Sequence, residues 1–210
     1  MAVLLLTTSD APAQVPNPDL MREQHAWRRC IGLAPAASDQ ERVASCTWLI
    51  ERSGGGALAV KPLTARGHAR LEQCDLAGAR ADLDQAIRLF PRSADALLAR
   101  GGLRQATGDL SGAMADIDAA IDARPNAAAG YSNRGNLRRR LGDVAGAAAD
   151  HDKAVRLAPN VAAVYQNRGQ LRRDQGDRAG AMADFGEAMR LDPHARRRAC
   201  AAGRPPPRAG

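Results

Sequence analysis

The feature that most constrains the fold is a strict period of 34 residues along most of the chain. Four prolines mark it: Pro91, Pro125, Pro159 and Pro193. A period of this size is typical of stacked repeats, in which each unit packs only on its neighbours. Proline cannot continue a helix, so each proline indicates where a helix-containing repeat ends.

Small residues recur with the same period. Their side chains allow two antiparallel helices to approach closely. They occupy one glycine position and two alanine positions: Gly67, Gly101, Gly135 and Gly169; Ala79, Ala113, Ala147 and Ala181; Ala86, Ala120, Ala154 and Ala188. The sequence therefore predicts an all-α solenoid of antiparallel helix pairs. The low aromatic content of 3% and the abundance of Ala, Leu, Gly and Arg also favour closely packed helices.

The order of these positions carries a resemblance. A glycine is followed by alanine 12 residues later, by alanine after 7 more and by proline after 5 more. This spacing resembles the tetratricopeptide repeat (TPR) over residues 60 to 195. The resemblance implies an all-α TPR solenoid that binds proteins. One departure is that the early aromatic of the family appears only as Tyr131 and Tyr165, where the first two repeats have Leu63 and Leu97.

We expect four repeats between a divergent N-terminal helix pair and a disordered basic tail. An Asp after each inter-helix turn is expected to cap the second helix of its repeat. The expected segments are 1–14, a remnant signal-like segment; 15–56, the helical pair; 60–93, 94–127, 128–161 and 162–195, the repeats; and 196–210, the tail. The last repeat has no polar capping helix after it, so its apolar face is a possible contact for a partner or a second copy.

The formal net charge of +7 lies largely in the expected tail. Five arginines follow the last repeat, and without them 25 basic residues face 23 acidic ones. The alternative function class, binding of nucleic acid or an acidic surface through this Arg-rich tail, therefore depends on the tail alone, without interleaved aromatic residues.

The N-terminus resembles the end of a secretion signal. An apolar stretch from Ala2 to Leu6 precedes small residues, with cleavage expected before Gln14. This favours a periplasmic or secreted bacterial protein; a cytoplasmic protein with a disordered tail is the alternative.

Two cysteines are placed for a disulfide. Ser38 and Glu41 form a capping-box pattern, so a helix is expected to start there, and Cys30 and Cys46 lie eight residues on either side of Ser38. A hairpin turning near Ser38 brings them to the same height. A disulfide is favoured in an exported protein; two buried free thiols are the alternative. The segment also resembles a divergent module that precedes TPR arrays in exported bacterial proteins.

Charged residues recur in all four repeats. One arginine set lies as far before the inter-helix turn as an aspartate set lies after it, which predicts Arg–Asp pairs within or between repeats. These are Arg66, Arg100, Arg134 and Arg168, with Asp82, Asp116, Asp150 and Asp184. A second arginine set lies one helical turn further on: Arg70, Arg104, Arg138 and Arg172. A basic binding face is the competing interpretation, above all for the second set.

The TPR resemblance implies a partner-binding groove along the first helix of each repeat. The matching positions are Ser132, Asn133, Asn136, Arg139 and Arg140, then Gln166, Asn167, Gln170 and Arg173. Their amides suit the backbone of an extended peptide. The basic character favours an acidic partner; a solvated polar face without a ligand is the alternative.

Catalysis is not expected. The sequence has no Gly-rich phosphate loop, no metal-spaced cluster and no nucleophile with a base at a motif spacing, so no cofactor and no metal are predicted. His151 occupies a packing position, and Cys74 and Cys200 are taken as structural or incidental thiols.

Overall fold

The computed structural model describes residues 17–34 and 37–193. In this part of the chain ten α-helices and one 3-10 helix follow one another, without a strand. They are α1 (Pro18–Cys30), α2 (Asp39–Arg52), η1 (Ala57–Ala59), α3 (Val60–Glu72), α4 (Leu76–Leu89), α5 (Ala94–Thr107), α6 (Leu110–Ala123), α7 (Ala128–Arg140), α8 (Val144–Leu157), α9 (Ala162–Asp174) and α10 (Arg178–Leu191). The expected signal-like segment 1–14, the tail 196–210 and Cys200 lie outside the described residues.

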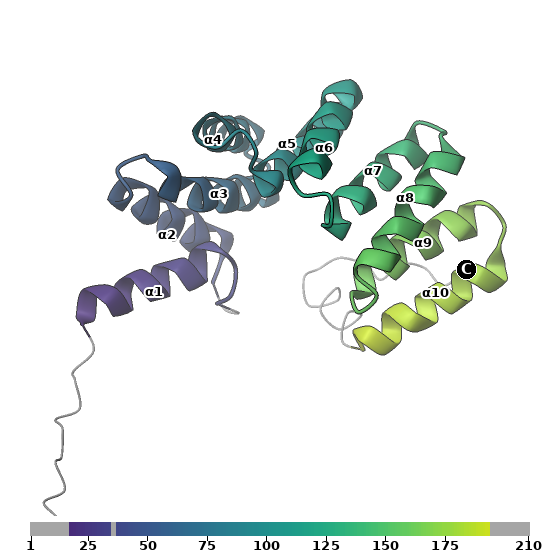
Figure 1. Ribbon diagram of the computed structural model, residues 1–210. Coiled ribbons are helices and arrows are strands. Elements are labelled where there is room, and N and C mark those ends of the chain that lie inside the picture. Colours follow the sequence, from purple (N-terminus) through teal and green to yellow (C-terminus); the bar gives the residue numbers. More distant parts are fainter. Residues whose placement is uncertain (1–16, 35–36, 194–210) are drawn as a thin grey trace, which may run out of the picture.

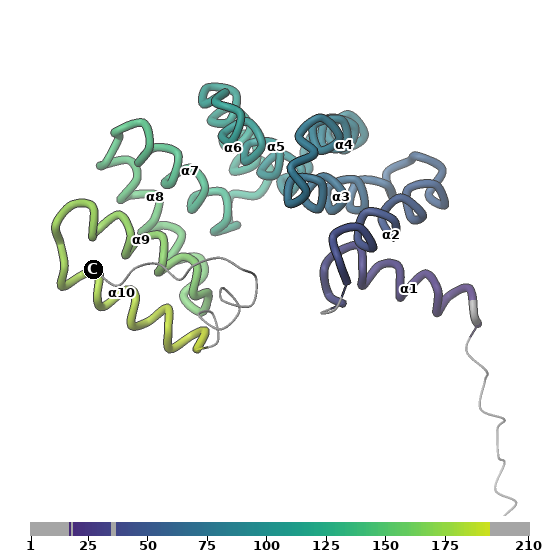
Figure 2. Tube along the Cα trace, turned by 180° about the vertical axis from the view of Figure 1, so that it is seen from behind, coloured from purple at the N-terminus to yellow at the C-terminus, as the bar shows by residue number. Residues whose placement is uncertain are grey.

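The helices pair in chain order and the pairs stack into a curved array (Figures 1 and 2), with α1 at one end and α10 at the other. Each helix contacts its successor, and the first helices of the four repeats also contact one another, α3 with α5, α5 with α7 and α7 with α9. These four helices therefore form one continuous layer of the array. The predicted all-α solenoid is confirmed.

The second helix of each repeat begins at an aspartate cap. Asp75 accepts a hydrogen bond from the backbone N–H of Gly78 at 2.9 Å, and Asp109, Asp143 and Asp177 do the same in the later repeats. Cys74, at the preceding turn, has φ 62° where the later repeats have glycine. The left-handed conformation costs a cysteine more than a glycine, so this turn carries backbone strain.

The repeated glycines lie where two helices touch. A Cβ added to Gly67 would lie 2.9 Å from Cγ of Leu83, a fully buried side chain of the paired helix. Gly135 faces the ring of His151 and Gly169 the ring of Phe185 in the same way. The periodic glycines are therefore contact points between the helices of a repeat.

Candidate functional site

The aspartates of the arginine–aspartate pairs are buried inside the repeats. Arg100 donates from Nη2 and Nε to the two carboxylate oxygens of Asp116, at 2.7 and 2.9 Å, and Asp116 is only 4% exposed. The same bidentate geometry joins Arg66 with Asp82, Arg134 with Asp150, and Arg168 with Asp184. Two parallel hydrogen bonds hold guanidinium and carboxylate in one orientation, so these groups tie the two helices of a repeat together.

The second arginine set binds the same aspartates. Arg104 Nη1 lies 2.8 Å from Asp116 Oδ2 and also donates to the backbone carbonyl of Gly112 at 3.0 Å. Arg70, Arg138 and Arg172 each contact the aspartate of their own repeat in this way. The structure thus uses the second set inside the repeats rather than as a free basic face.

A third aspartate links consecutive repeats, which the sequence reasoning missed. Arg100 Nη1 donates to Asp84 of the preceding repeat at 2.9 Å. In the same way, Asp118 accepts a hydrogen bond from Arg134, and Asp152 accepts one from Arg168. The 34-residue recurrence of Asp84, Asp118 and Asp152 was the available signal. At the first repeat Arg66 donates instead to Thr47 of α2, at 2.9 Å.

These contacts fix the charge state of the arginines. The hydrogen bond to Asp116 is the main cause that raises the pKa of Arg100 above its usual value, against an opposing effect of desolvation; Asp84 raises it further. The pKa values of Arg134 and Arg168 are raised for the same reasons, with Asp150 and Asp184 as the main partners. These three arginines therefore keep their positive charge within the repeats.

Some of the expected groove residues bind one another across α7 and α9. Ser132 is buried, at 6% exposure, and accepts a hydrogen bond from Nδ2 of Asn167 at 2.7 Å. This corrects the expectation that Ser132 faces a ligand, because burial removes its hydroxyl from the surface. Asn167 is half-buried and has one donor committed to this bond.

Three further groove residues converge on Asp174, which the sequence analysis did not single out. Arg139 donates to Oδ2 of Asp174 across the repeat boundary, and Gln170 donates to Oδ1 at 2.9 Å. Arg173 lies 3.8 Å from the same carboxylate. Asp174 therefore neutralises part of the positive charge expected in this half of the groove.

Four groove residues keep their side chains uncommitted within the described part of the chain. Asn133, Asn136, Arg140 and Gln166 make no side-chain hydrogen bond there, and Arg140 and Gln166 are exposed. In addition, Nε of Arg139 is buried without a hydrogen-bond partner. The four uncommitted side chains leave donors and acceptors available on α7 and α9, whereas the buried Nε of Arg139 does not.

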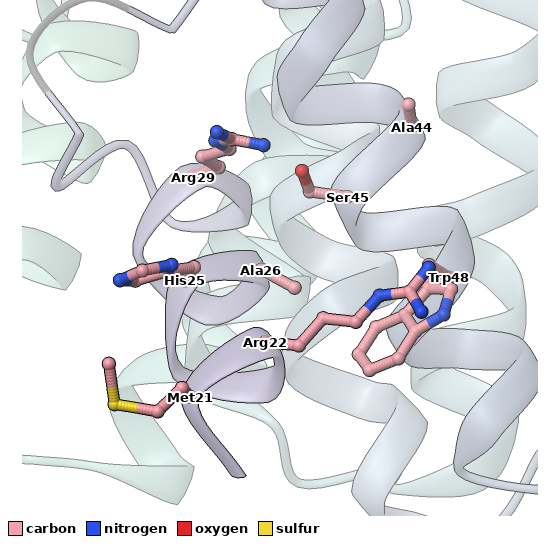
Figure 3. Close-up of a pocket in the computed structure, with 8 residues that line it drawn as sticks. All are labelled: Met21, Arg22, His25, Ala26, Arg29, Ala44, Ser45 and Trp48. Carbon is pink, nitrogen blue, oxygen red and sulfur yellow. The ribbon is translucent and has the colours of Figure 1, made fainter. Parts of the chain in front are cut away.

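The N-terminal helix pair is held by a disulfide. Cys30 at the end of α1 is bonded to Cys46 in α2, with their Cα atoms 4.8 Å apart. The Ser38–Glu41 capping box starts α2. An open pocket of about 710 Å³ lies between the two helices, lined by Met21, Arg22, His25, Ala26, Arg29, Ala44, Ser45 and Trp48 (Figure 3).

The described residues contain no group of three or more His, Cys, Asp or Glu side chains arranged to hold a metal ion. His151 is fully buried, and neither of its ring nitrogens has a hydrogen-bond partner. Burial lowers its pKa; the nearby carboxylate of Asp150 opposes this shift. None of the described helices is long and apolar enough to cross a membrane.

The sequence matches models of a known protein family. One model described as tetratricopeptide repeat matches residues 64–128 and 103–162, and a second matches residues 162–194. These matches run over more than half of the sequence. The chain belongs to the tetratricopeptide repeat family.

Solved structures share the TPR fold at low sequence identity. A thermophilic TPR protein of Thermus thermophilus is 16% identical with a TM-score of 0.73, over 86% of this chain and 98% of that one. MamA from Desulfovibrio magneticus RS-1 is 18% identical with a TM-score of 0.59, over 83% and 97%. YrrB, described as a TPR protein with an unusual peptide-binding site, is 14% identical with a TM-score of 0.52, over 83% and 88%. No curated protein matches the sequence.

Proposed function

We propose that this TPR protein is a non-catalytic scaffold that binds an extended peptide or a protein partner in the groove along α3, α5, α7 and α9. The observation that carries the proposal is the row of uncommitted polar groups on α7 and α9. Amides that make no internal hydrogen bond are suited to the backbone of an extended chain. The peptide-binding site of YrrB, a protein with the same fold, is consistent with this proposal.

The layer geometry supports this choice of surface. Successive first helices of the repeats lie close enough to contact one another. A layer in which neighbours approach in this way is on the inner side of a curved stack. The inner side offers a partner a continuous surface over several repeats.

The ligand chemistry follows from the charges that remain. Arg140 is exposed without a carboxylate partner among the described residues, whereas Arg139 and Arg173 contact Asp174. We therefore place an acidic group of the ligand next to Arg140, with its backbone along Asn133, Asn136 and Gln166. No small-molecule substrate, cofactor or metal enters this proposal.

The proposed scaffold consists of a helical pair at 15–56 followed by four repeats, at 60–93, 94–127, 128–161 and 162–195. The signal-like segment 1–14 favours the periplasm of a bacterium or secretion, with the cytoplasm as the alternative. Exposed Met182 and Met189 on α10 offer a surface through which two copies can associate.

A second candidate function is binding of nucleic acid or an acidic surface by the arginines of the tail 196–210. Five arginines in fifteen residues support it. Deletion of residues 196–210 separates the two functions. Retained partner binding supports the groove, and lost binding supports the tail.

The direct test is a pull-down with mass spectrometry that compares the wild type with Asn133→Ala/Asn136→Ala/Arg140→Ala. These positions make no side-chain hydrogen bonds in the described structure, so the variant is expected to melt like the wild type. Arg156→Ala on α8 is the charge-matched control, because Arg156 is exposed outside the groove. A partner lost only from the triple variant supports the groove. A partner retained by all three proteins overturns the groove assignment.

A further inference from the structure

The arginines of α1 differ from the eight recurring arginines of the repeats in having no carboxylate partner among the described residues. All eight recurring arginines of the repeats contact an aspartate. In the described part of the chain no carboxylate lies within ion-pair distance of Arg22 or Arg29, and both side chains are exposed. Their charges are therefore available to something outside the chain.

Two acidic side chains of α1 and α2, Glu23 and Glu41, already have partners. The Glu41 carboxylate accepts hydrogen bonds from the backbone N–H and the hydroxyl of Ser38, at 2.8 and 2.9 Å. These bonds are the main cause that lowers the pKa of Glu41, and the charge of Arg29 adds to the effect. Glu23 of α1 pairs with Arg52 of α2, Oε2 lying 3.5 Å from Nε.

An aromatic ring holds one of the two arginines in place. The guanidinium carbon of Arg22 lies 5.4 Å from the centroid of Trp48, and that of Arg52 lies 5.5 Å from it. Figure 3 shows the Arg22 side chain extended along the pocket toward Trp48. A guanidinium packed against a ring keeps the N–H groups at its edge free for a carboxylate.

The pocket combines positive charge with apolar surface. Its lining residues include Arg22, His25 and Arg29 but no acidic residue, and Met21, Ala26, Ala44 and Trp48 supply apolar area. Arg22 and Arg29 are two helical turns apart on one side of α1, so their backbones are separated by roughly 10 Å. All the lining residues belong to α1 and α2, outside the four repeats.

We propose that this α1–α2 pocket is a second docking site, which binds an acidic amphipathic segment of a partner protein. Two carboxylates of the segment, about two helical turns apart, pair with Arg22 and Arg29, and an apolar side chain between them lies against Trp48. The Cys30–Cys46 disulfide holds the two walls of the pocket together. The site is separate from the groove of the repeats and does not depend on it.

The test uses the full chain and a blocked helical peptide with two glutamates two turns apart and leucines between them. A companion peptide has glutamine in place of glutamate. We expect the acidic peptide to bind, the companion to bind at least about tenfold more weakly, and the affinity to fall with added salt. No binding of the acidic peptide by the wild type overturns the proposal.

Arg28 provides the matched control. Arg29→Gln and Arg28→Gln remove the same charge from adjacent exposed positions, but only Arg29 lines the pocket. We expect Arg29→Gln to lower the affinity for the acidic peptide at least about tenfold. Arg28→Gln should leave this affinity within about twofold of the wild type. Equal effects of the two variants overturn the proposal, because they indicate attraction by net charge alone. The Arg29 side chain makes no hydrogen bond or ion pair within the described residues, so its loss is not expected to unfold α1.

Two further measurements exclude other occupants. If Asn133→Ala/Arg140→Ala abolishes peptide binding while Arg29→Gln does not, the peptide binds in the groove; the pocket proposal then fails and the proposed function stands. If vesicles of anionic phosphatidylglycerol bind through Arg22 and Arg29 and the acidic peptide does not, the site recognises a lipid surface, which also overturns the proposal.

Discussion

Asp116 is almost fully buried, and both of its carboxylate oxygens accept hydrogen bonds from Arg100, sixteen residues earlier in the chain. Four copies of this relationship run through the repeats, one in each helix pair. Because the aspartate is buried and the arginine is partly exposed, the desolvation cost falls mainly on the carboxylate. We therefore expect the stability of each repeat to depend on keeping its aspartate paired.

Replacement of Asp116 tests this dependence. Asp116→Ala leaves the guanidinium groups of Arg100 and Arg104 without their main partner, and we expect it to lower the free energy of unfolding by about 3 kcal/mol. Asp118→Ala is the control, because the Asp118 side chain is 48% exposed and its pair with Arg134 lies near solvent; a loss within about 1 kcal/mol is expected there. Urea denaturation of both variants measures the difference, and equal losses would contradict a special role for the buried carboxylate.

Gly67 and Gly102 differ in the space available for an added Cβ. A Cβ at Gly67 meets buried Leu83 at 2.9 Å, so Gly67→Ala is expected to cost about 1–3 kcal/mol through overpacking. Gly102, also inside a first helix, has no atom within 4 Å of an added Cβ. Gly102→Ala should instead stabilise the protein by about 0.5–1 kcal/mol. Thermal melts of the two variants should therefore shift in opposite directions, and a common direction would argue against the helix contact at Gly67.

His151 makes stability depend on pH. Desolvation lowers its pKa in the folded state, and Arg139 and Arg168 act in the same direction, whereas Asp150 and Asp152 oppose them. The unfolded chain, with a histidine pKa near about 6.5, then binds more protons than the folded chain as the pH falls. We expect the free energy of unfolding to decrease below about pH 6.5.

The variant that isolates this effect is His151→Leu, since Leu83 occupies the matching position of the first repeat. Leucine needs no hydrogen bond, so we expect a gain of about 1 kcal/mol at neutral pH and a weaker pH dependence. Burial lowers the pKa of His68 as well, so part of the pH dependence should persist. The test is the free energy of unfolding measured from about pH 5 to about pH 8. An unchanged dependence of this free energy on pH in the variant would show that His151 is not the source.

Loss of the disulfide should release α1. Cys30→Ser/Cys46→Ser removes a bond that closes a short loop, and we expect a loss of about 3 kcal/mol. Hydrogen exchange is expected to increase in α1 and α2 and to stay unchanged in the four repeats, because contacts of a solenoid are made between neighbours. Cys74→Ser, a change at an exposed free thiol, is the control. Peptide mapping without reductant that finds both thiols free would contradict the disulfide itself.

The sequence by itself determined the architecture, because a solenoid is built from local interactions. The period placed the helix ends, the recurring aspartates indicated the caps, and the equal distances of Arg100 and Asp116 from their turn predicted a pair. These features depend only on antiparallel helix geometry within one repeat. They can be found without any relative, since the chain itself repeats them every 34 residues.

Only the tertiary structure decided which side chains remain available for binding. Ser132 and Asn133 are adjacent in the sequence, but the first is buried against Asn167 and the second is uncommitted. Asp174 draws in Arg139 from the preceding repeat, and Arg22 packs on Trp48 across two helices. These contacts depend on how one helix is offset and rotated against the next, and a 34-residue pattern does not contain that information.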